Sequence, residues 1–534
     1  NYNLLRKESF YSVMSDWNPA EMIGLKPKPL ALSLYKELIT NKVWAQSRFE
    51  YGYKDLRSHQ LMNTFLGTPY IDLRVDFNSW IPKDLPHNIS KKLVNYYLKI
   101  FKNNKEFHDK IEFKIIFSCY TLDTKKKIKV LLKHGFTKKE LAVIISSLKK
   151  ITRITFGKLS SEINLINKLI DRQKKIKKFG DDYIAKIYWL IEDCKKFGTL
   201  PFSGLARCGF VSVEILDSLL NKKIITLRDK ENFMKSIETI TSQIQKDYSK
   251  EKKVFLSKYG HLRPNTYEIN SLNYKDGYDI YFKKQSHKNK IIRNKKYSFK
   301  FSTNQVKKIK SFLKNEKFNF TFDQFEYFLK KSIQLREYSK FIFTKNIDLL
   351  FNNLKLFAKK FGLKETDLTY LKISKILDMN YNYTTFKNIP DLKKDILNNK
   401  IEYDYNNLLK MPEVLLGKKD LFFNKEKSNS NFIGTSTAFG KTMYLNKFKP
   451  NINYNRIVCI NNADPGFDFI FTKKISGLIT KFGGVNSHMA IRCAELGIPA
   501  VIGVGENLFN QIIKSPLATI DCQRKNIILN GKYI

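Results

Sequence analysis

His488 is the residue whose type and surroundings are best suited to chemistry. It is one of seven histidines in 534 residues and lies in the stretch KFGGVNSHMAIRCAEL, directly after Ser487 and shortly after Gly483 and Gly484. A neutral imidazole is a competent nucleophile near pH 7. The glycines permit a sharp turn and a close approach, and Ser487 suits a helix cap that can also bond an anion. A helix N-terminus favours phosphate through its free N–H groups and its dipole. The pattern predicts a histidine that accepts a phosphoryl group and passes it on, whereas the commoner alternative is a surface or core histidine at a helix start.

The elements that must position this histidine follow a strand–turn–helix–strand order. SGLIT is expected to be a strand, residues 488–496 a helix, and IPAVIGV the next strand. GKTMYLN and RIVCINN are expected as strands before it, and ATIDC with NIILN as a closing hairpin. Residues 432–534 are therefore expected to form a compact β/α domain.

The residues of this region match a known family. The stretch ADPGFDFIFTKKISGLITKFGGVNSHMAIRCAELGIPAVIGVG resembles the mobile phosphohistidine domain of the phosphoenolpyruvate-utilising enzymes, which include phosphoenolpyruvate synthase, pyruvate phosphate dikinase and rifampin phosphotransferase. The resemblance implies that His488 is phosphorylated during catalysis and that Gly483, Gly484, Ser487 and Met489 stabilise the phosphoryl group. Met489 stands where the family often has alanine.

The chain upstream divides by its periodicity. Residues 1–92 are rich in aromatic residues and proline and are expected to be mixed α/β, whereas residues 93–423 show mainly helical periods. The polar stretch 424–431 is expected to be a linker. The predicted fold class is therefore multidomain α+β, with a mostly helical central region followed by a C-terminal β/α swivelling phosphohistidine domain.

Four upstream stretches resemble the segment between the ATP-grasp and histidine domains of such enzymes: SVMSDWNPAEMIG, PFSGLARCGFVSVEIL, KYGHLRPNTYEI and REYSKFIFTKN. The resemblance implies that residues 1–423 are mainly an acceptor-substrate region. His261 and Arg263 either brace a loop or act on the acceptor, His261 as acid/base and Arg263 as a grip on a phosphoryl oxygen or a carboxylate. Arg336 is a further candidate, although a helical ion-pair face with Glu337 and Lys340 is favoured.

Two parts of these enzymes are not recognised in the sequence, namely an ATP-grasp segment and a C-terminal pyruvate-binding barrel. The first residue is Asn. The resemblance therefore implies that ATP and Mg²⁺ bind to an ATP-grasp domain in the same longer chain or in a separate subunit, with a small molecule as acceptor. The alternatives are a non-catalytic phosphocarrier or regulatory remnant, and an antibiotic-type (rifampin-like) phosphotransferase.

The amino-acid composition bears on whether nucleic acid is a partner of this chain. The net charge of +46 would suit a nucleic-acid partner, but the excess is mostly Lys, is spread over amphipathic segments and accompanies no nucleic-acid motif. Compositional drift is favoured, and no specific nucleic acid is expected.

The six cysteines form no CxxC pair, which favours a reducing compartment. No apolar run reaches the ~18 residues of a membrane span, and the start has no signal-peptide pattern, so a cytoplasmic location without membrane contact is expected.

Overall fold

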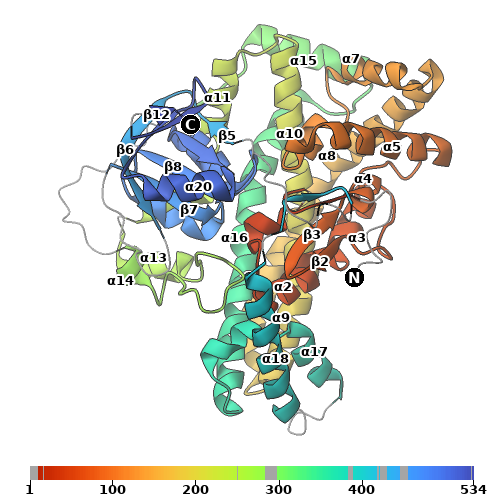
Figure 1. The fold of residues 1–534 in the computed structure, drawn as a ribbon. Coiled ribbons are helices and arrows are strands. Elements are labelled where there is room, and N and C mark those ends of the chain that lie inside the picture. Colours follow the sequence, from red (N-terminus) through yellow and green to blue (C-terminus); the bar gives the residue numbers. More distant parts are fainter. Residues whose placement is uncertain are drawn as a thin grey trace.

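The structure is a computed structural model. It describes residues 10–15, 17–248, 250–282, 298–382, 389–409, 411–417, 420, 430–445, 455–530 and 532–533. The chain forms a small N-terminal sheet with short helices, a central set of long helices and a C-terminal sheet domain, which confirms the multidomain α+β class. Figure 1 shows the C-terminal domain in blue on one side of helix α16 and the N-terminal elements in red and orange on the other.

The N-terminal sheet has the strand order β2-β3-β1-β4, and all of its pairs are antiparallel. Its strands are β1 (Tyr11–Ser12), β2 (Met62–Phe65), β3 (Thr68–Asp72) and β4 (Val414–Leu415). β3 gives way to a helix at residue 73, because Asp72 accepts bonds from Arg74 N at 2.9 Å and Val75 N at 3.2 Å and so caps α4. β4 comes from far along the chain, so residues 1–92 do not complete this sheet alone.

The N-terminal and central regions also contain short helices. They are α1 (Pro19–Met22), α2 (Pro29–Tyr35), α3 (Val43–Glu50), α4 (Leu73–Ser79), α6 (Ile111–Lys114), α7 (Thr124–Lys127), α11 (Leu227–Lys235), α12 (Ile240–Asp247), α13 (Lys252–Tyr259) and α14 (Tyr278–Tyr281).

The central region consists of long helices, as the helical periods predict. They are α5 (His87–Asn103), α8 (Lys138–Lys175), α9 (Tyr183–Cys194), α10 (Leu200–Asn221), α15 (Thr303–Asn315), α16 (Phe322–Lys360), α17 (Ile373–Asn382) and α18 (Ile389–Asn407). A capping box starts α8, with Thr137 and Glu140 bonding each other's backbone. α16 packs along α10 and α9 and forms the axis of the region. No helix in the described part of the chain is long and apolar enough to cross a bilayer.

The C-terminal domain is built on a sheet with the order β12-β11-β10-β6-β7-β8-β9-β5. The strands β6 to β9 are parallel, and the outer pairs are antiparallel. Its elements are β5 (Asn431–Ile433), β6 (Thr437–Tyr444), β7 (Arg456–Asn462), β8 (Gly477–Phe482), α19 (His488–Leu496), β9 (Ala500–Ile502), α20 (Gly505–Lys514), β10 (Leu517–Asp521), β11 (Asn526–Leu529) and β12 (Lys532–Tyr533). The predicted strands and the predicted helix are confirmed. Of the expected linker 424–431, all but residues 430 and 431 lies outside the described residues.

The two faces of this sheet have different partners. Along β7, Ile457 and Cys459 point into a core that α20 closes, whereas Val458 and Ile460 point into a second core under α19. The second core continues into residues of α12, α13 and α14, including Ile244, Phe255 and Tyr281. The histidine-bearing side of the domain is therefore packed against the central region.

Candidate active site

The turn before His488 depends on glycine. Gly483 has φ of 143°, and a Cβ there would lie 2.8 Å from Ala463 Cβ and 2.9 Å from Ile502 Cγ2. A Cβ on Gly484 would lie 3.3 Å from the carbonyl oxygen of Asp109, so this turn packs closely against the loop before α6. Ser487 then caps α19 by accepting a bond from Ala490 N at 3.2 Å. His488 is the first residue of the helix, as predicted.

The His488 side chain is held between two carboxylates. Its Nδ1 atom lies 2.6 Å from Oε2 of Glu337 on α16, and its Nε2 atom lies 2.8 Å from Oδ1 of Asp468. The residue is only 5% exposed. Arg492, one helical turn further, has its Nε 3.3 Å from the same Nε2 atom, so it can donate to that nitrogen when the nitrogen carries no proton. Nε2 therefore has a hydrogen-bond acceptor, Asp468, when it carries a proton, and a donor, Arg492, when it does not.

We refer to the pair of carboxylates, Glu337 and Asp468, on the two ring nitrogens of His488 as the clamp. The charges of the clamp favour the protonated form of the ring. Burial lowers the pKa of His488, but the Asp468 and Glu337 carboxylates outweigh burial and raise that pKa above its ordinary value. Burial likewise opposes ionisation of Glu337, but His488, Arg492 and Arg336 hold its pKa well below the usual range. An imidazolium bound on both nitrogens has no lone pair for attack, so the ring is not a nucleophile in this protonated, doubly bonded arrangement.

The charged residues expected to form an ion-pair face on α16 lie at the site. Arg336 does pair with Glu337, at 3.6 Å, but it also donates to Asn486 O at 3.1 Å, in the turn before His488. Lys340 is 9% exposed, and its Nζ lies 3.7 Å from Met22 Sδ of α1. This face of α16 is therefore buried against α19 and α1 instead of facing solvent.

Glu337, Lys340 and Asp468 are site residues that the sequence analysis did not identify. For Glu337 and Lys340, the residue pattern of α16 contains a signal that could have identified them. Buried positions recur there at spacings of three and four residues: Ile333, Glu337, Lys340, Thr344, Ile347 and Phe351. Two charged residues thus occupy the apolar stripe of a helix, and charges are rarely buried without partners or a task. Asp468 lies inside the ADPGFDF motif but has no comparable periodic signal.

His261 and Arg263 are both bonded to α16. The ring Nε2 of His261 lies 2.9 Å from Phe341 O, and burial lowers its pKa to about 4, which keeps the ring neutral. The guanidinium of Arg263 forms an ion pair with Asp348 and donates to Ser271 O at 3.2 Å. These bonds favour the loop-bracing interpretation of Arg263. Both residues line a cavity of about 20 Å³ on one side of His488.

Met489 requires a correction. Its side chain is fully buried in the core beneath α19, together with Ala490 and Cys493. It therefore packs the helix onto the sheet, and its side chain is not positioned to contact a phosphoryl group.

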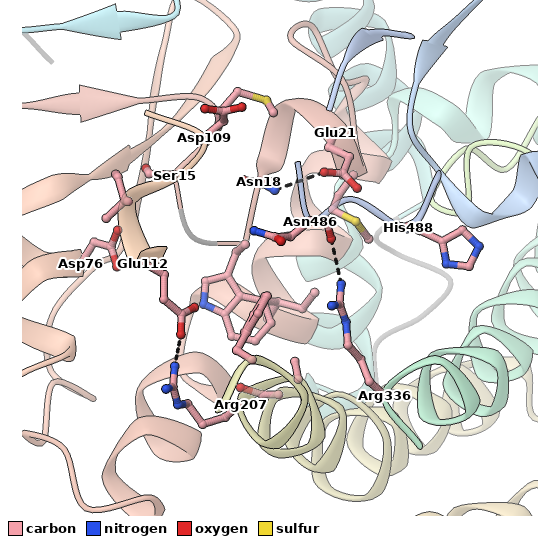
Figure 2. A pocket seen from close by; sticks show the side chains of 18 of the residues that line it. Ser15, Asn18, Glu21, Asp76, Asp109, Glu112, Arg207, Arg336, Asn486 and His488 are labelled. Carbon is pink, nitrogen blue, oxygen red and sulfur yellow. Dashed lines mark hydrogen bonds and ion pairs between the residues drawn. The ribbon is translucent and has the colours of Figure 1, made fainter. Parts of the chain in front are cut away.

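A larger cavity of about 150 Å³ lies on the other side of His488, bounded by the N-terminal segment, residues 108–113, α10 and α16. Figure 2 shows Asn18, Glu21, Asn486 and Arg336 between His488 and the opposite wall, where Ser15, Asp76, Glu112 and Arg207 lie. The same cavity is lined by the rings of Trp17, Tyr35, Trp80, Phe113, Phe202 and Phe210. We refer to this space as the aromatic pocket. Among the described residues, no group of three His, Cys, Asp or Glu side chains is arranged to hold a metal ion.

Fold and site together define a multidomain protein in which a β/α domain presents a histidine at the first position of a helix to a pocket in a helical region. Residues 452–525 match the family described as PEP-utilising enzyme, mobile domain, and the C-terminal domain of this chain belongs to that family. The chain is 34% identical over 92 residues to a phosphoenolpyruvate synthase of Aquifex aeolicus, which is 17% of this chain and 10% of the relative.

Two further relatives match over similarly short regions. A phosphoenolpyruvate synthase of Synechocystis sp. is 32% identical over 73 residues, or 14% of this chain and 8% of the relative. A pyruvate kinase of Sporosarcina psychrophila is 33% identical over 101 residues, or 18% of this chain and 17% of the relative. The chain thus matches less than a fifth of the length of each of these proteins, and the similarity supports a family of PEP-utilising phosphotransferases.

Proposed function

We propose that this chain is a phosphotransferase component that carries a phosphoryl group on His488 to an acceptor in the aromatic pocket. The observation that carries the proposal is that His488 lines this pocket together with Arg336 and Lys340. These side chains bring positive charge to the position where a phosphoryl group would be transferred. The relatives named phosphoenolpyruvate synthase support the same reaction class.

His488 would be loaded away from the pocket. ATP with Mg²⁺, bound to an ATP-grasp unit of the same longer chain or of a separate subunit, would supply the phosphoryl group. The domain 432–534 would then swing on the 424–431 linker and dock against residues 93–423. After transfer, Glu337 and Asp468 would hold the discharged ring as an imidazolium, which stabilises the leaving group.

The turn residues would assist His488 through the backbone. Gly483 and Gly484 allow the chain to turn sharply and to pack closely against its neighbours, and Ser487 fixes the first helical turn. Docking involves several further contacts, among them Thr241 Oγ1 to Asp468 Oδ2 at 2.7 Å and Tyr274 Oη to Gly466 O at 2.9 Å. The six free, buried cysteines support a reducing, cytoplasmic location.

Labelling tests this proposal. The chain is incubated with Mg²⁺, the ATP-grasp unit of a synthase-type relative, and ATP labelled at the β or the γ position in parallel reactions. Acid-labile, base-stable label should appear on the chain and should be lost in His488→Ala and His488→Asn, which lack the imidazole nitrogen. His261→Ala should keep the label. Equal labelling of His488→Ala and the parent from both positions would show that His488 is only a helix-start residue.

A further inference from the structure

The aromatic pocket has equal numbers of carboxylates and of Lys or Arg side chains, although the chain is strongly basic. Its described lining contains five carboxylates, Glu21, Asp76, Asp109, Glu112 and Glu337, and five Lys or Arg residues, Arg48, Lys110, Arg207, Arg336 and Lys340. The chain as a whole has a net charge of +46. Arg207 is bound to Glu112, and Arg48 lies over the Trp80 ring at 3.6 Å. No excess of cations is therefore available in this lining for an anionic acceptor, beyond Arg336 and Lys340 beside His488.

The body of the pocket suits rings and neutral polar groups. Six aromatic side chains line it, and aromatic walls favour stacked or edge-on contact with another ring. Two serine hydroxyls in the same lining, Ser15 Oγ and Ser203 Oγ, are buried and have no hydrogen-bond partner among the residues that the structure describes. Buried hydroxyl groups are normally bonded, so these two are suited to bond a ligand. The lining thus favours an uncharged, ring-bearing acceptor with more than one polar group.

Transfer to a hydroxyl group requires a base, and Glu21 is the carboxylate best placed for it. Glu21 lies on α1, is 4% exposed, and lines the pocket with His488, Arg336 and Lys340. Asn18 Nδ2 donates to its Oε2 at 3.1 Å, which orients the carboxylate. Pro19 at the start of α1 and the bond from Ala20 N to Val13 O fix this short helix in place.

The other carboxylates of the lining are committed to partners. Glu337 binds His488, Glu112 binds Arg207, Asp76 accepts from Trp80 Nε1 at 3.0 Å, and Asp109 accepts from Asn431 Nδ2 at 2.7 Å. Burial raises the pKa of Glu21 to about 7, although Lys340, the Asn18 amide, Arg336 and His488 act against burial. A carboxylate with that pKa can accept a proton near neutral pH.

We propose that Glu21 is the general base that takes the hydroxyl proton of an uncharged, ring-bearing acceptor, a role that rests on the proposed function of His488. In the step, the acceptor oxygen forms a bond to phosphorus while the bond between phosphorus and the His488 ring nitrogen breaks. The electron pair of that bond returns to the imidazole, and the hydroxyl proton goes to Glu21. The products are a phosphate monoester and the free histidine.

The test separates loading from transfer. The full chain is phosphorylated chemically with potassium phosphoramidate, and the phosphate on His488 is quantified by mass spectrometry. The loaded chain is then mixed with 2-naphthol, benzyl alcohol, pyruvate or inorganic phosphate, and the phosphorylated products are measured. The variants are Glu21→Gln, Glu21→Asp and the control Glu37→Gln, whose residue bonds Lys195 and does not line the pocket. His488→Ala gives the background.

We expect an aryl or benzyl phosphate from the parent and from Glu37→Gln, at a rate that rises with pH through about 7. Glu21→Gln should load equally but transfer about 100-fold more slowly, without that pH dependence, and Glu21→Asp should retain part of the rate. Equal transfer by loaded Glu21→Gln and parent overturns the role of Glu21. Transfer only to pyruvate or phosphate, or to none of the four probes, overturns the acceptor class. A parent that cannot be loaded on His488 overturns the proposed function itself.

Discussion

The Nδ1 atom of His488 and the Oε2 atom of Glu337 lie 2.6 Å apart, although the two residues are separated by 151 positions in the sequence. Glu337 belongs to α16 of the central region, whereas Asp468, the other partner of the ring, belongs to the same domain as His488. A carboxylate and a phosphoryl group cannot occupy the same ring nitrogen. This docked arrangement is therefore that of an unphosphorylated histidine, and phosphorylation and the clamp exclude each other.

Removing the clamp should lower the pKa of His488. In Glu337→Gln that pKa should fall, and in Glu337→Gln combined with Asp468→Asn it should fall below its ordinary value of 6.5, because burial then acts unopposed. NMR titration of the imidazole signals measures the change. Glu326→Gln on the same helix, where Glu326 pairs with Lys330, should leave the value unchanged. An unaltered His488 pKa in the double variant would contradict the clamp.

The clamp should also make stability depend on pH. The pKa of His488 is higher in the folded than in the unfolded chain, so the contribution of this pairing is fully present below about pH 6.5 and is lost as the pH rises through the raised value. His488→Gln should therefore lower the free energy of unfolding by about 3 kcal/mol at pH 5.5 and by less at pH 9. Denaturant titration of parent and variant at both pH values measures this. A larger loss at pH 9 than at pH 5.5 would contradict it.

The packing of the C-terminal domain against the central region should be disrupted by the addition of a single methyl group at position 466. A Cβ at this position would lie 1.6 Å from the carbonyl oxygen of Arg263, so the ADPG and YGHLRP motifs meet backbone to backbone. Gly466→Ala should separate the C-terminal domain from the central region and increase the radius of gyration measured by small-angle X-ray scattering. Gly157→Ala in α8, where a Cβ would meet nothing within 4 Å, is the matched control and should be stabilising by up to about 1 kcal/mol. A compact Gly466→Ala protein would show that this contact does not govern docking.

Limited proteolysis tests the expected hinge. A polar linker at 424–431 should be cut before the helical region and should release a folded fragment corresponding to residues 432–534. Mass spectrometry of the first products locates the cut. First cuts within 138–175 or 322–360, the two longest helices, would count against a swivelling terminal domain.

The parts predicted well were those specified by neighbouring residues. The Gly-Gly turn, the Ser487 cap and the bounds of the following helix depend on local conformational preferences, which a single sequence carries. The clamp depends on a tertiary contact, so nothing adjacent to His488 indicates Glu337. The pairing of β4 with β1 was likewise not predictable, because a two-residue strand has no period and its partner lies some 400 positions away. The aromatic pocket combines residues from position 14 to position 488, which only the folded chain brings together.

The placement of Arg336, Glu337 and Lys340 on the single helix α16 has a consequence for the accuracy of the proposed phosphoryl transfer. Their spacing is set by helical geometry, and α16 runs for 39 residues without a break among packed neighbours. The three side chains on α16 are therefore held in a fixed relation to one another, and they cannot move independently to fit the C-terminal domain. What can vary is the position in which the C-terminal domain docks against α16. If the domain swings as proposed, the backbone contact at Gly466 would define the end of its movement, and the reproducibility of that contact would set the fraction of encounters that lead to transfer.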